Sequence, residues 1–243
     1  MATVVSFGGG VNSTALLCGL RQRGERPDFI VFADTGGEKP ETYEHISQMQ
    51  DWCVVVGFPC IEIVREFITL EQDCLDRETL PGKAFGFGSC SEHFKIRPQR
   101  RWLKANGLTD VTWLVGFHAG EVRRVWPGAN AGESIRHPLI EWGWTQTDCL
   151  AAIRSAGLSA PVKSACFFCP SMRKREVLQI AKQHLELFER AVAMERTAAP
   201  NMATVRGLGR QYSWEKLVAA DDAQLKLFDD EQFPICAACF DGE

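Results

Sequence analysis

A strand, a glycine loop and a helix follow one another at residues 4–17, and this unit constrains the fold more than any other feature of the sequence. Four mostly apolar residues lead into Gly8-Gly9-Gly10, and a helical pattern begins at once, capped by Asn12 or Ser13. Glycines let backbone N–H groups approach an anion closely, and a helix N-terminus adds about half a positive charge there. The spacing matches neither the Walker loop nor the GxGxxG fingerprint. The unit therefore predicts a phosphate site of another kind, with an ordinary glycine turn as the alternative.

Apolar runs of strand length alternate with helical patterns along the chain. The predicted strands are 2–7, 28–33, 59–64 and 112–117, and the predicted helices are 13–23, 40–56, 94–105, 145–156 and 172–197. This alternation predicts a doubly wound, Rossmann-like α/β fold in which helices cover both faces of a parallel sheet. Ligands bind at the carboxyl ends of such strands, where Gly8–Ser13 and the polar turn Asp34–Glu38 would both lie.

The same pattern divides the chain into two regions. We expect an α/β nucleotide-binding domain over residues 1–162 and a mainly helical region with a cysteine site over 163–243. Segment 126–134 has the character of an exposed loop, and the pattern after Pro200 indicates only a helical, partly charged appendage. The predicted anion site therefore belongs to the first region.

The composition limits the class of protein. No apolar run in the 243 residues approaches the length of about 20 that crosses a bilayer, and no signal-peptide pattern precedes the first strand. We therefore expect a cytoplasmic protein with no membrane partner. In that compartment the ten cysteines are expected to bind metal or act in catalysis rather than form disulfides. The net charge of −4 excludes a uniformly basic surface but permits a local basic patch.

Three cysteine sites stand out, namely Cys90, Cys166-x-x-Cys169 and Cys236-x-x-Cys239. The phenylalanines and proline of CFFCP favour a shielded thiolate centre, with a buried cysteine pair beside aromatic residues as the alternative. Cys236 and Cys239 would complete a four-ligand centre, bind a separate zinc ion, or act as a redox or sulfur-relay pair, and a frayed tail is the alternative. The other five are predicted to be small hydrophobic residues: Cys18, Cys53, Cys60, Cys74 and Cys149.

Two of the motifs described above resemble those of the PP-loop ATP pyrophosphatase superfamily, and in particular of its phosphoadenosine phosphosulfate reductase-like family. The segment Gly8–Ser13 is similar to SGGxDS, with Gly8 and Asn12 in place of serine and aspartate. Asp34-Thr35-Gly36, followed by a Pro-Glu-Thr triplet at 40–42, resembles the family's D-T-G and P-E-T signature. The resemblance implies that both turns face an adenine nucleotide.

Two further segments resemble the same family in the same order. Cys90 and the residues up to Pro98 are similar to C-C-x-x-R-K-V-x-P-L, with one cysteine of the pair present. Gly116–Arg124 resembles G-x-R-x-x-E-S-x-x-R, where arginines grip an oxyanion, and His118 stands in place of the first arginine. The family's catalytic E-C-G-[IL]-H motif has no counterpart in the C-terminal part of this chain.

The resemblance implies roles for named residues. Nucleotide contacts are expected from Ser6, Phe7, Gly8, Gly9, Gly10, Asn12, Ser13, Thr14, Asp34, Thr35, Gly36, Gly116 and Glu121. Catalytic roles are expected for Asn12, Ser13, Asp34, Arg123 and Arg124, with Mg²⁺ as a cofactor. A [4Fe-4S] cluster, or alternatively Zn²⁺, is expected on Cys90, Cys166, Cys169, Cys236 and Cys239, with His93 as a further candidate ligand.

The leading hypothesis is an enzyme that cleaves ATP and adenylates an acceptor with release of pyrophosphate. Sulfur supplied through the cluster at Cys90, Cys166 and Cys169 then displaces AMP, with a sulfur donor protein as a partner. A tRNA or DNA acceptor would bind the basic helix 94–104, although a solvated helix face is the alternative there. Two other functions stay open. One is a sulfonucleotide reductase, and the other is a regulatory protein that binds the nucleotide and has lost the chemistry.

Overall fold

The computed structural model describes residues 1–125 and 130–230, and these contain one parallel sheet of five strands. The strands are β1 (Ala2–Phe7), β2 (Phe29–Asp34), β3 (Ile61–Arg65), β4 (Val111–Val115) and β5 (Glu133–Arg136). They lie in the order β3-β2-β1-β4-β5, and every neighbouring pair is parallel. The order reverses between β1 and β4, so a ligand crevice is expected at the carboxyl ends of these two strands. The predicted doubly wound parallel sheet is confirmed.

Helices and short turns connect the strands. The α-helices are α1 (Val11–Gln22), α2 (Pro40–Val56), α3 (Leu70–Asp76), α4 (Ser89–Ser91), α5 (Arg97–Ala105), α6 (Pro138–Glu141), α7 (Gln146–Ser155), α8 (Lys174–Gln183), α9 (Leu185–Ala198) and α10 (Trp214–Asp230). The 3₁₀ turns are η1 (Gly82–Phe85), η3 (Ala119–Arg124) and η4 (Ala199–Asn201), and a π-helical turn, η2 (Glu92–Ile96), leads into α5.

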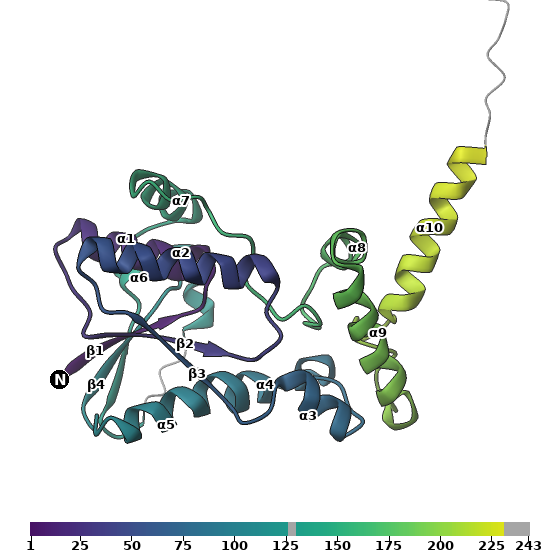
Figure 1. Ribbon diagram of the computed structural model, residues 1–243, viewed down its shortest axis with the longest axis horizontal. Helices are drawn as coiled ribbons and strands as arrows, with labels where there is room; N and C mark the ends of the chain where they lie inside the picture. Colours follow the sequence, from purple (N-terminus) through teal and green to yellow (C-terminus); the bar gives the residue numbers. More distant parts are fainter. Residues whose placement is uncertain (126–129, 231–243) are drawn as a thin grey trace, which may run out of the picture.

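Alternate residues of β1 pack into two apolar cores, one on each face of the sheet. Val5 and Phe7 pack with residues of α1, α2 and α7, whereas Val4 packs with Val31 and Trp113 and with Leu103 of α5. Figure 1 shows α1 and α2 over one face and α5 over the other. Because both faces are covered, the central strands are mostly apolar, as is typical of parallel sheets.

The C-terminal helices form a third apolar core beside the sheet. Phe167 and Phe168 pack with α3, α8 and α9 and with Trp214 at the start of α10. Figure 1 shows α8 and α9 at the edge of the sheet region, with α10 extending away from it. No helix within the described ranges is both long and apolar enough to cross a membrane. A domain boundary near residue 163 stays a prediction.

Two predicted segments are wrong in detail. The single helix expected over 172–197 is broken at His184, whose φ of −139° and ψ of 63° lie outside the helical region. The imidazole Nε2 lies 2.7 Å from Glu41 Oε1 at the start of α2, a contact across the sequence that no local pattern predicts. The loop expected over 126–134 is wrong for Glu133 and Ser134, because both belong to β5 and pair with β4.

Candidate functional site

The glycine loop joins β1 to α1 at the carboxyl edge of the sheet. Gly9 has a φ of +68°, a conformation that side-chain-bearing residues rarely adopt. Gly10 is the N-cap of α1 and supplies no side-chain cap, while the first turn carries no acidic residue. The Ser13 hydroxyl hydrogen-bonds Gly10, accepting from its N–H at 3.3 Å. The first backbone N–H groups of α1 therefore have no intrahelical acceptor, as an anion site requires.

The segment after β4 packs directly on the start of α1. Asn12 Nδ2 donates to Glu121 Oε2 at 2.6 Å, while Asn12 Oδ1 is buried with no hydrogen-bond partner among the described residues. A Cβ on Gly116 would lie 2.8 Å from the Asn12 carbonyl oxygen, so only glycine permits this approach. The predicted residues Asn12, Gly116 and Glu121 thus meet at the glycine loop.

The Asp34 turn follows β2 at the same edge. Asp34 Oδ1 accepts hydrogen bonds from the Gly36 N–H and from the Tyr43 hydroxyl, each at 2.8 Å. Burial and the bond to Asp34 raise the pKa of Tyr43, which keeps its hydroxyl a donor. The Thr35 hydroxyl lies 3.1 Å from Cys166 Sγ. Both hydrogen bonds involve Oδ1, so Oδ2 is the Asp34 oxygen that is available to bind a ligand.

The Cys166–Cys169 turn is docked on both loops. Phe167 N–H donates to the Gly37 carbonyl at 2.7 Å, and Ser164 Oγ donates to the Gly8 carbonyl at 2.6 Å. Cys169 N–H closes the turn by donating to the Cys166 carbonyl at 2.9 Å. Burial is the main cause that raises the pKa of Cys166 to about 12, whereas Cys169 is partly exposed. The more accessible thiol of the pair is therefore Cys169.

An ion pair between a buried glutamate and a partly exposed lysine lies at this junction. The Glu38 side chain is fully buried, and its carboxylate lies 3.4 Å from Lys95 Nζ. The other carboxylate oxygen lies 3.3 Å from Ser164 Oγ, and Glu38 also forms an isolated backbone bridge with Cys166. Breaking a buried pair by removing one partner leaves a costly unpaired charge. Glu38 therefore holds the cysteine segment against the glycine loop.

Some predicted contact residues turn their side chains into the core. Phe7 and Thr14 are buried, the Thr14 hydroxyl lies 2.8 Å from His45 Nε2, and the Phe7 ring stacks on the same imidazole. Their contribution to a nucleotide site is therefore limited to backbone groups and to support of the loop.

A cleft of about 420 Å³ lies beside the glycine loop on the α5 side of the sheet. Ser6 in its lining is two residues before Gly8, and Phe117 follows Gly116. The Phe117 and His137 rings stack 5.2 Å apart and nearly parallel, at 15°. The full lining is Ser6, Ile96, Gln99, Arg100, Trp113, Val115, Phe117, Arg124, Glu133, Ile135 and His137. A cleft that combines aromatic side chains with polar groups is typical of small-ligand sites.

Comparison with known proteins identifies the family. The family model of the phosphoadenosine phosphosulfate reductase domain matches residues 2–152. The chain belongs to this family. No curated protein sequence matches it. Among solved structures it is similar to the phosphoadenylyl-sulfate (PAPS) reductase of Candida auris in its phosphate complex, at 16% identity and a TM-score of 0.49, covering 66% of this chain and 75% of the other. It is also similar to the U34-tRNA thiolase NcsA of Methanococcus maripaludis with its [4Fe-4S] cluster, at 13% identity and a TM-score of 0.43, covering 87% and 76%.

The arginine segment of this PAPS reductase-family chain is partly neutralised. Arg124 pairs with Glu121, and its guanidinium lies 4.6 Å from the centroid of Phe117. Arg123 is exposed and has no ion-pair carboxylate among the described residues. His118, which replaces the first arginine, accepts from Gly120 N–H at Nδ1 and caps η3. Of the two predicted arginines, Arg123 is therefore the one free to meet a phosphate.

The described residues of this family member do not by themselves fit a four-ligand metal centre. Cys90 packs against the same apolar core as the Cys166–Cys169 turn, and it lines a cavity of about 230 Å³ together with Cys74 and His93. Within residues 1–125 and 130–230 no three His, Cys, Asp or Glu side chains are grouped as metal ligands. Cys236 and Cys239 lie outside the described residues. Of the five predicted cysteine ligands, the described residues thus bring Cys166 and Cys169 together in one turn.

Several residues of the site were not predicted from the sequence. Glu38, Tyr43 and Ser164 hold the two loops and the cysteine turn together, and His137 builds the cleft. Glu38 and Ser164 could have been found from the sequence, since Glu38 ends the predicted turn Asp34–Glu38 and Ser164 lies two residues before Cys166. His137 had none, because its stacking on Phe117 depends on the pairing of β4 with β5.

Proposed function

We propose that this protein is an ATP-using PP-loop enzyme that adenylates an acceptor and then passes sulfur to it. The observation that carries the proposal is the 2.6 Å hydrogen bond between Ser164 Oγ and the Gly8 carbonyl, which ties the cysteine turn to the glycine loop. A thiol pair held against an anion-binding loop is suited to chemistry between a sulfur nucleophile and an adenylated acceptor.

The nucleotide is assigned to the glycine loop and the neighbouring cleft. The backbone N–H groups of Gly8–Ser13 and the start of α1 would bind phosphates, because they present unpaired donors and a positive helix end. The adenosine would enter the cleft beside Phe117 and His137, whose stacked rings offer an aromatic wall. Arg123 is free to meet a phosphate oxygen with its planar guanidinium.

Magnesium fits the oxygen atoms of this edge. Asn12 Oδ1 is a buried oxygen without a donor, and one oxygen of Asp34 is free of the hydrogen bonds that occupy the other. Oxygen ligands of this kind are those that Mg²⁺ prefers, so Asn12 and Asp34 would hold it. When bound, it would supply positive charge to neutralise the departing pyrophosphate.

The chemistry has two steps. An acceptor oxygen attacks the α-phosphorus of ATP, the bond from that phosphorus to the bridging oxygen breaks, and pyrophosphate leaves with the electron pair. A persulfide of the donor protein would pass its outer sulfur to Cys169, which is more accessible than Cys166, and the donor thiolate would leave. The outer sulfur of the Cys169 persulfide then attacks the acceptor carbon, and AMP leaves with its oxygen. Cys166 attacks Cys169 Sγ, which releases the sulfur on the acceptor and leaves a Cys166–Cys169 disulfide that an external dithiol reduces. The protein contributes by positioning and by the dipoles of the glycine loop.

Incubation with Mg²⁺ and α-labelled ATP tests the proposal. We expect AMP and pyrophosphate to form in the presence of an acceptor, with bulk tRNA and duplex DNA as the first acceptors to be tried. Gly9→Ala should abolish both products, because alanine is strained at a φ of +68°. Gly88→Ala is the control, because its new Cβ meets nothing within 4 Å and its φ is −84°. Absence of AMP and pyrophosphate with every acceptor would reject the proposal.

Sulfonucleotide reduction is the second candidate, and the match of residues 2–152 to the reductase domain favours it. This activity requires a thiol that attacks the sulfur of the sulfonucleotide and leaves sulfite after reduction. Cys236 and Cys239 are the candidate thiols in that case. Sulfite release from phosphoadenosine phosphosulfate that disappears in Cys236→Ser or Cys239→Ser, with nucleotide binding unchanged, would establish it.

A regulatory nucleotide-binding protein is the third candidate. The bonding of Glu121 favours it, because its carboxylate already accepts a hydrogen bond from the Asn12 amide and forms an ion pair with the Arg124 guanidinium. Nucleotide binding without release of AMP, pyrophosphate or sulfite under any condition would establish this function. The two enzyme functions would then both be rejected.

A further inference from the structure

The first part of the helical region, residues 163–216, carries an excess of basic residues. Between residues 163 and 216, ten lysines and arginines stand against five glutamates, whereas the whole chain has 27 basic residues against 31 acidic ones. Four of the ten basic side chains are paired with carboxylates in the structure, namely Lys163, Lys182, Arg190 and Arg196. The excess positive charge therefore lies on the remaining cations.

Three consecutive cations, Arg173, Lys174 and Arg175, have no such partner. All three are exposed, and no carboxylate of the described residues lies within ion-pair distance of them. Lys174 Nζ lies 5.2 Å from the ring centroid of Tyr212, which is partly exposed. We call these four residues the α8 surface: three exposed cations that are consecutive in the chain, one of which lies beside the Tyr212 ring.

The three cations stand where helix electrostatics disfavour them. Arg173 is the N-cap of α8, and Lys174 and Arg175 are its first two residues. The positive end of the helix dipole repels such charges by about 0.3–1 kcal/mol each, and in this first turn only Glu176 opposes them. Helix stability therefore does not account for the three cations at this position, whereas binding of an anionic partner would account for them.

The more basic helix of the sequence is not an equivalent surface. On η2 and α5, Lys95, Arg100 and Arg101 each lie within ion-pair distance of a glutamate. Most of the charge expected to attract a polyanion there is already neutralised within the protein. The α8 surface, rather than the predicted helix 94–104, keeps its charge for a partner.

We infer that the α8 surface docks the phosphate backbone of a nucleic acid, and that this nucleic acid is the acceptor. The surface begins directly after the cysteine turn, since Met172 N–H donates to the Cys169 carbonyl at 3.0 Å and Arg173 follows. Cations contact backbone phosphates without regard to sequence, and Tyr212 offers a ring on which an unpaired base stacks. A nucleotide held there lies next to Cys169, the accessible thiol. The acceptor assignment rests on the proposed sulfur transfer, whereas the docking surface does not.

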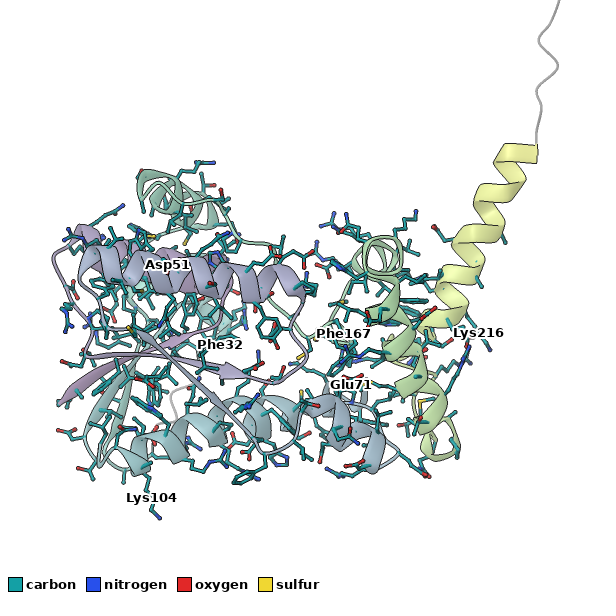
Figure 2. All side chains as sticks on the ribbon, viewed as in Figure 1. Phe32, Asp51, Glu71, Lys104, Phe167 and Lys216 are labelled. Carbon is teal, nitrogen blue, oxygen red and sulfur yellow. The ribbon has the colours of Figure 1, made fainter. Side chains whose placement is uncertain are left out.

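The test compares two triple variants of the full chain. Arg173→Gln/Lys174→Gln/Arg175→Gln removes the α8 cations, and Arg21→Gln/Lys104→Gln/Arg154→Gln removes three exposed cations of the sheet region. Figure 2 shows Lys104 at the end of α5, far from Lys216 on the helical region. Affinity for bulk tRNA and for a DNA duplex is measured by fluorescence anisotropy across a salt series. ATP binding by calorimetry is measured on the same preparations.

The affinity for nucleic acid falls as salt rises, and each phosphate contact contributes about 0.7–0.9 to the steepness of the plot of log K against log salt concentration. Loss of the three α8 cations should therefore make this plot less steep by about 2–3. The sheet-region variant should keep the wild-type slope. Equal losses in both variants, or no binding of either nucleic acid by the wild type, would overturn the inference. Because ATP binding and AMP release are measured separately, failure of the docking surface leaves the proposed function standing. Preference for tRNA or for the duplex identifies which nucleic acid the surface fits.

Discussion

Asn12 donates its side-chain amide to Glu121 Oε2 over 2.6 Å, joining the start of α1 to the turn after β4. The same carboxylate pairs with Arg124 and accepts from the backbone N–H of His118 at 3.4 Å. The bond explains why an amide stands where the SGGxDS motif has an aspartate. An aspartate at position 12 would set two carboxylates at hydrogen-bond distance with no proton between them.

Asn12→Asp should therefore destabilise the protein rather than restore a lost function. Replacing the amide removes the donor and places like charges together, which costs about 1–3 kcal/mol of unfolding free energy near neutral pH. The loss should shrink as the pH falls, because one carboxyl of the pair then takes a proton. Urea unfolding at several pH values measures this.

The matched control for that prediction is the double variant Asn12→Asp/Glu121→Gln. It restores one amide and one carboxylate with their positions exchanged, so most of the stability should return. A single Asn12→Asp variant as stable as the wild type would contradict the argument.

Gly116→Ala tests the packing of β4 on the glycine loop. A methyl group there would lie 2.8 Å from the Asn12 carbonyl oxygen, so α1 or the strand end must move. We expect a loss of about 1–3 kcal/mol of unfolding free energy, as for overpacking elsewhere, together with weaker nucleotide binding. Gly88→Ala is the control, since nothing lies within 4 Å of its new Cβ and its φ is −84°. Unchanged nucleotide affinity in Gly116→Ala would show that the glycine loop does not depend on this contact.

The sequence predicted those parts of the fold that depend on neighbouring residues. Glycines followed by a helical pattern predicted the loop at residues 8–13, and alternating apolar runs predicted the parallel sheet. The break at His184 was not predictable in this way, because it depends on Glu41, a residue on another helix. Strand β5 was missed for a similar reason: residues 133–136 are only partly buried and form a strand by pairing with β4.

The candidate site, like the fold, was predicted where it depends on neighbouring residues and not where it depends on contacts between distant ones. The motifs predicted which segments meet, but not which charges remain available after folding. Arg100, Arg101 and Arg124 looked free in the sequence, yet glutamates distant in the chain or across a turn neutralise them. Electrostatic roles depend on such pairings, and they become visible only when the elements are packed.

Ser164→Ala tests whether the cysteine turn must be held on the glycine loop. The substitution removes the 2.6 Å bond to the Gly8 carbonyl, with a cost of about 1 kcal/mol in unfolding free energy. We expect a larger effect on product formation than on ATP affinity, because the loop keeps its backbone donors while the thiols lose their position. Ser171→Ala, at an exposed serine of the same segment, is the control. Equal losses in the two variants would assign Ser164 no positioning role.

His45 should make the stability depend on pH. The imidazole is buried against Phe7 and Thr14, and burial lowers its pKa from the ordinary value. The unfolded chain therefore binds a proton before the folded protein does, so folding loses stability as the pH falls below about 6.5, down to the folded pKa. Each unit by which the pKa is lowered corresponds to about 1.4 kcal/mol.

His45→Gln is the variant that isolates this contribution. It keeps a polar group near the Thr14 hydroxyl but does not titrate, so the stability difference between wild type and variant should narrow on acidification. Urea unfolding of both proteins at matched pH values measures the difference. A constant difference across the acidic range would show that His45 does not titrate between the folded and unfolded states.

Removal of the tail cysteines tests the metal prediction. The described residues supply the Cys166–Cys169 pair but no third ligand grouped with it, so a four-ligand centre requires thiols from elsewhere in the chain. We therefore expect Cys236→Ser/Cys239→Ser to lower the iron or zinc content of anaerobically purified protein to the level of a Cys166→Ser/Cys169→Ser variant. Elemental analysis and the absorption spectrum measure the metal, and Cys60→Ser, at an exposed cysteine outside the site, is the control. Full metal content in the tail variant would exclude Cys236 and Cys239 as ligands and require Cys90 to move toward the turn.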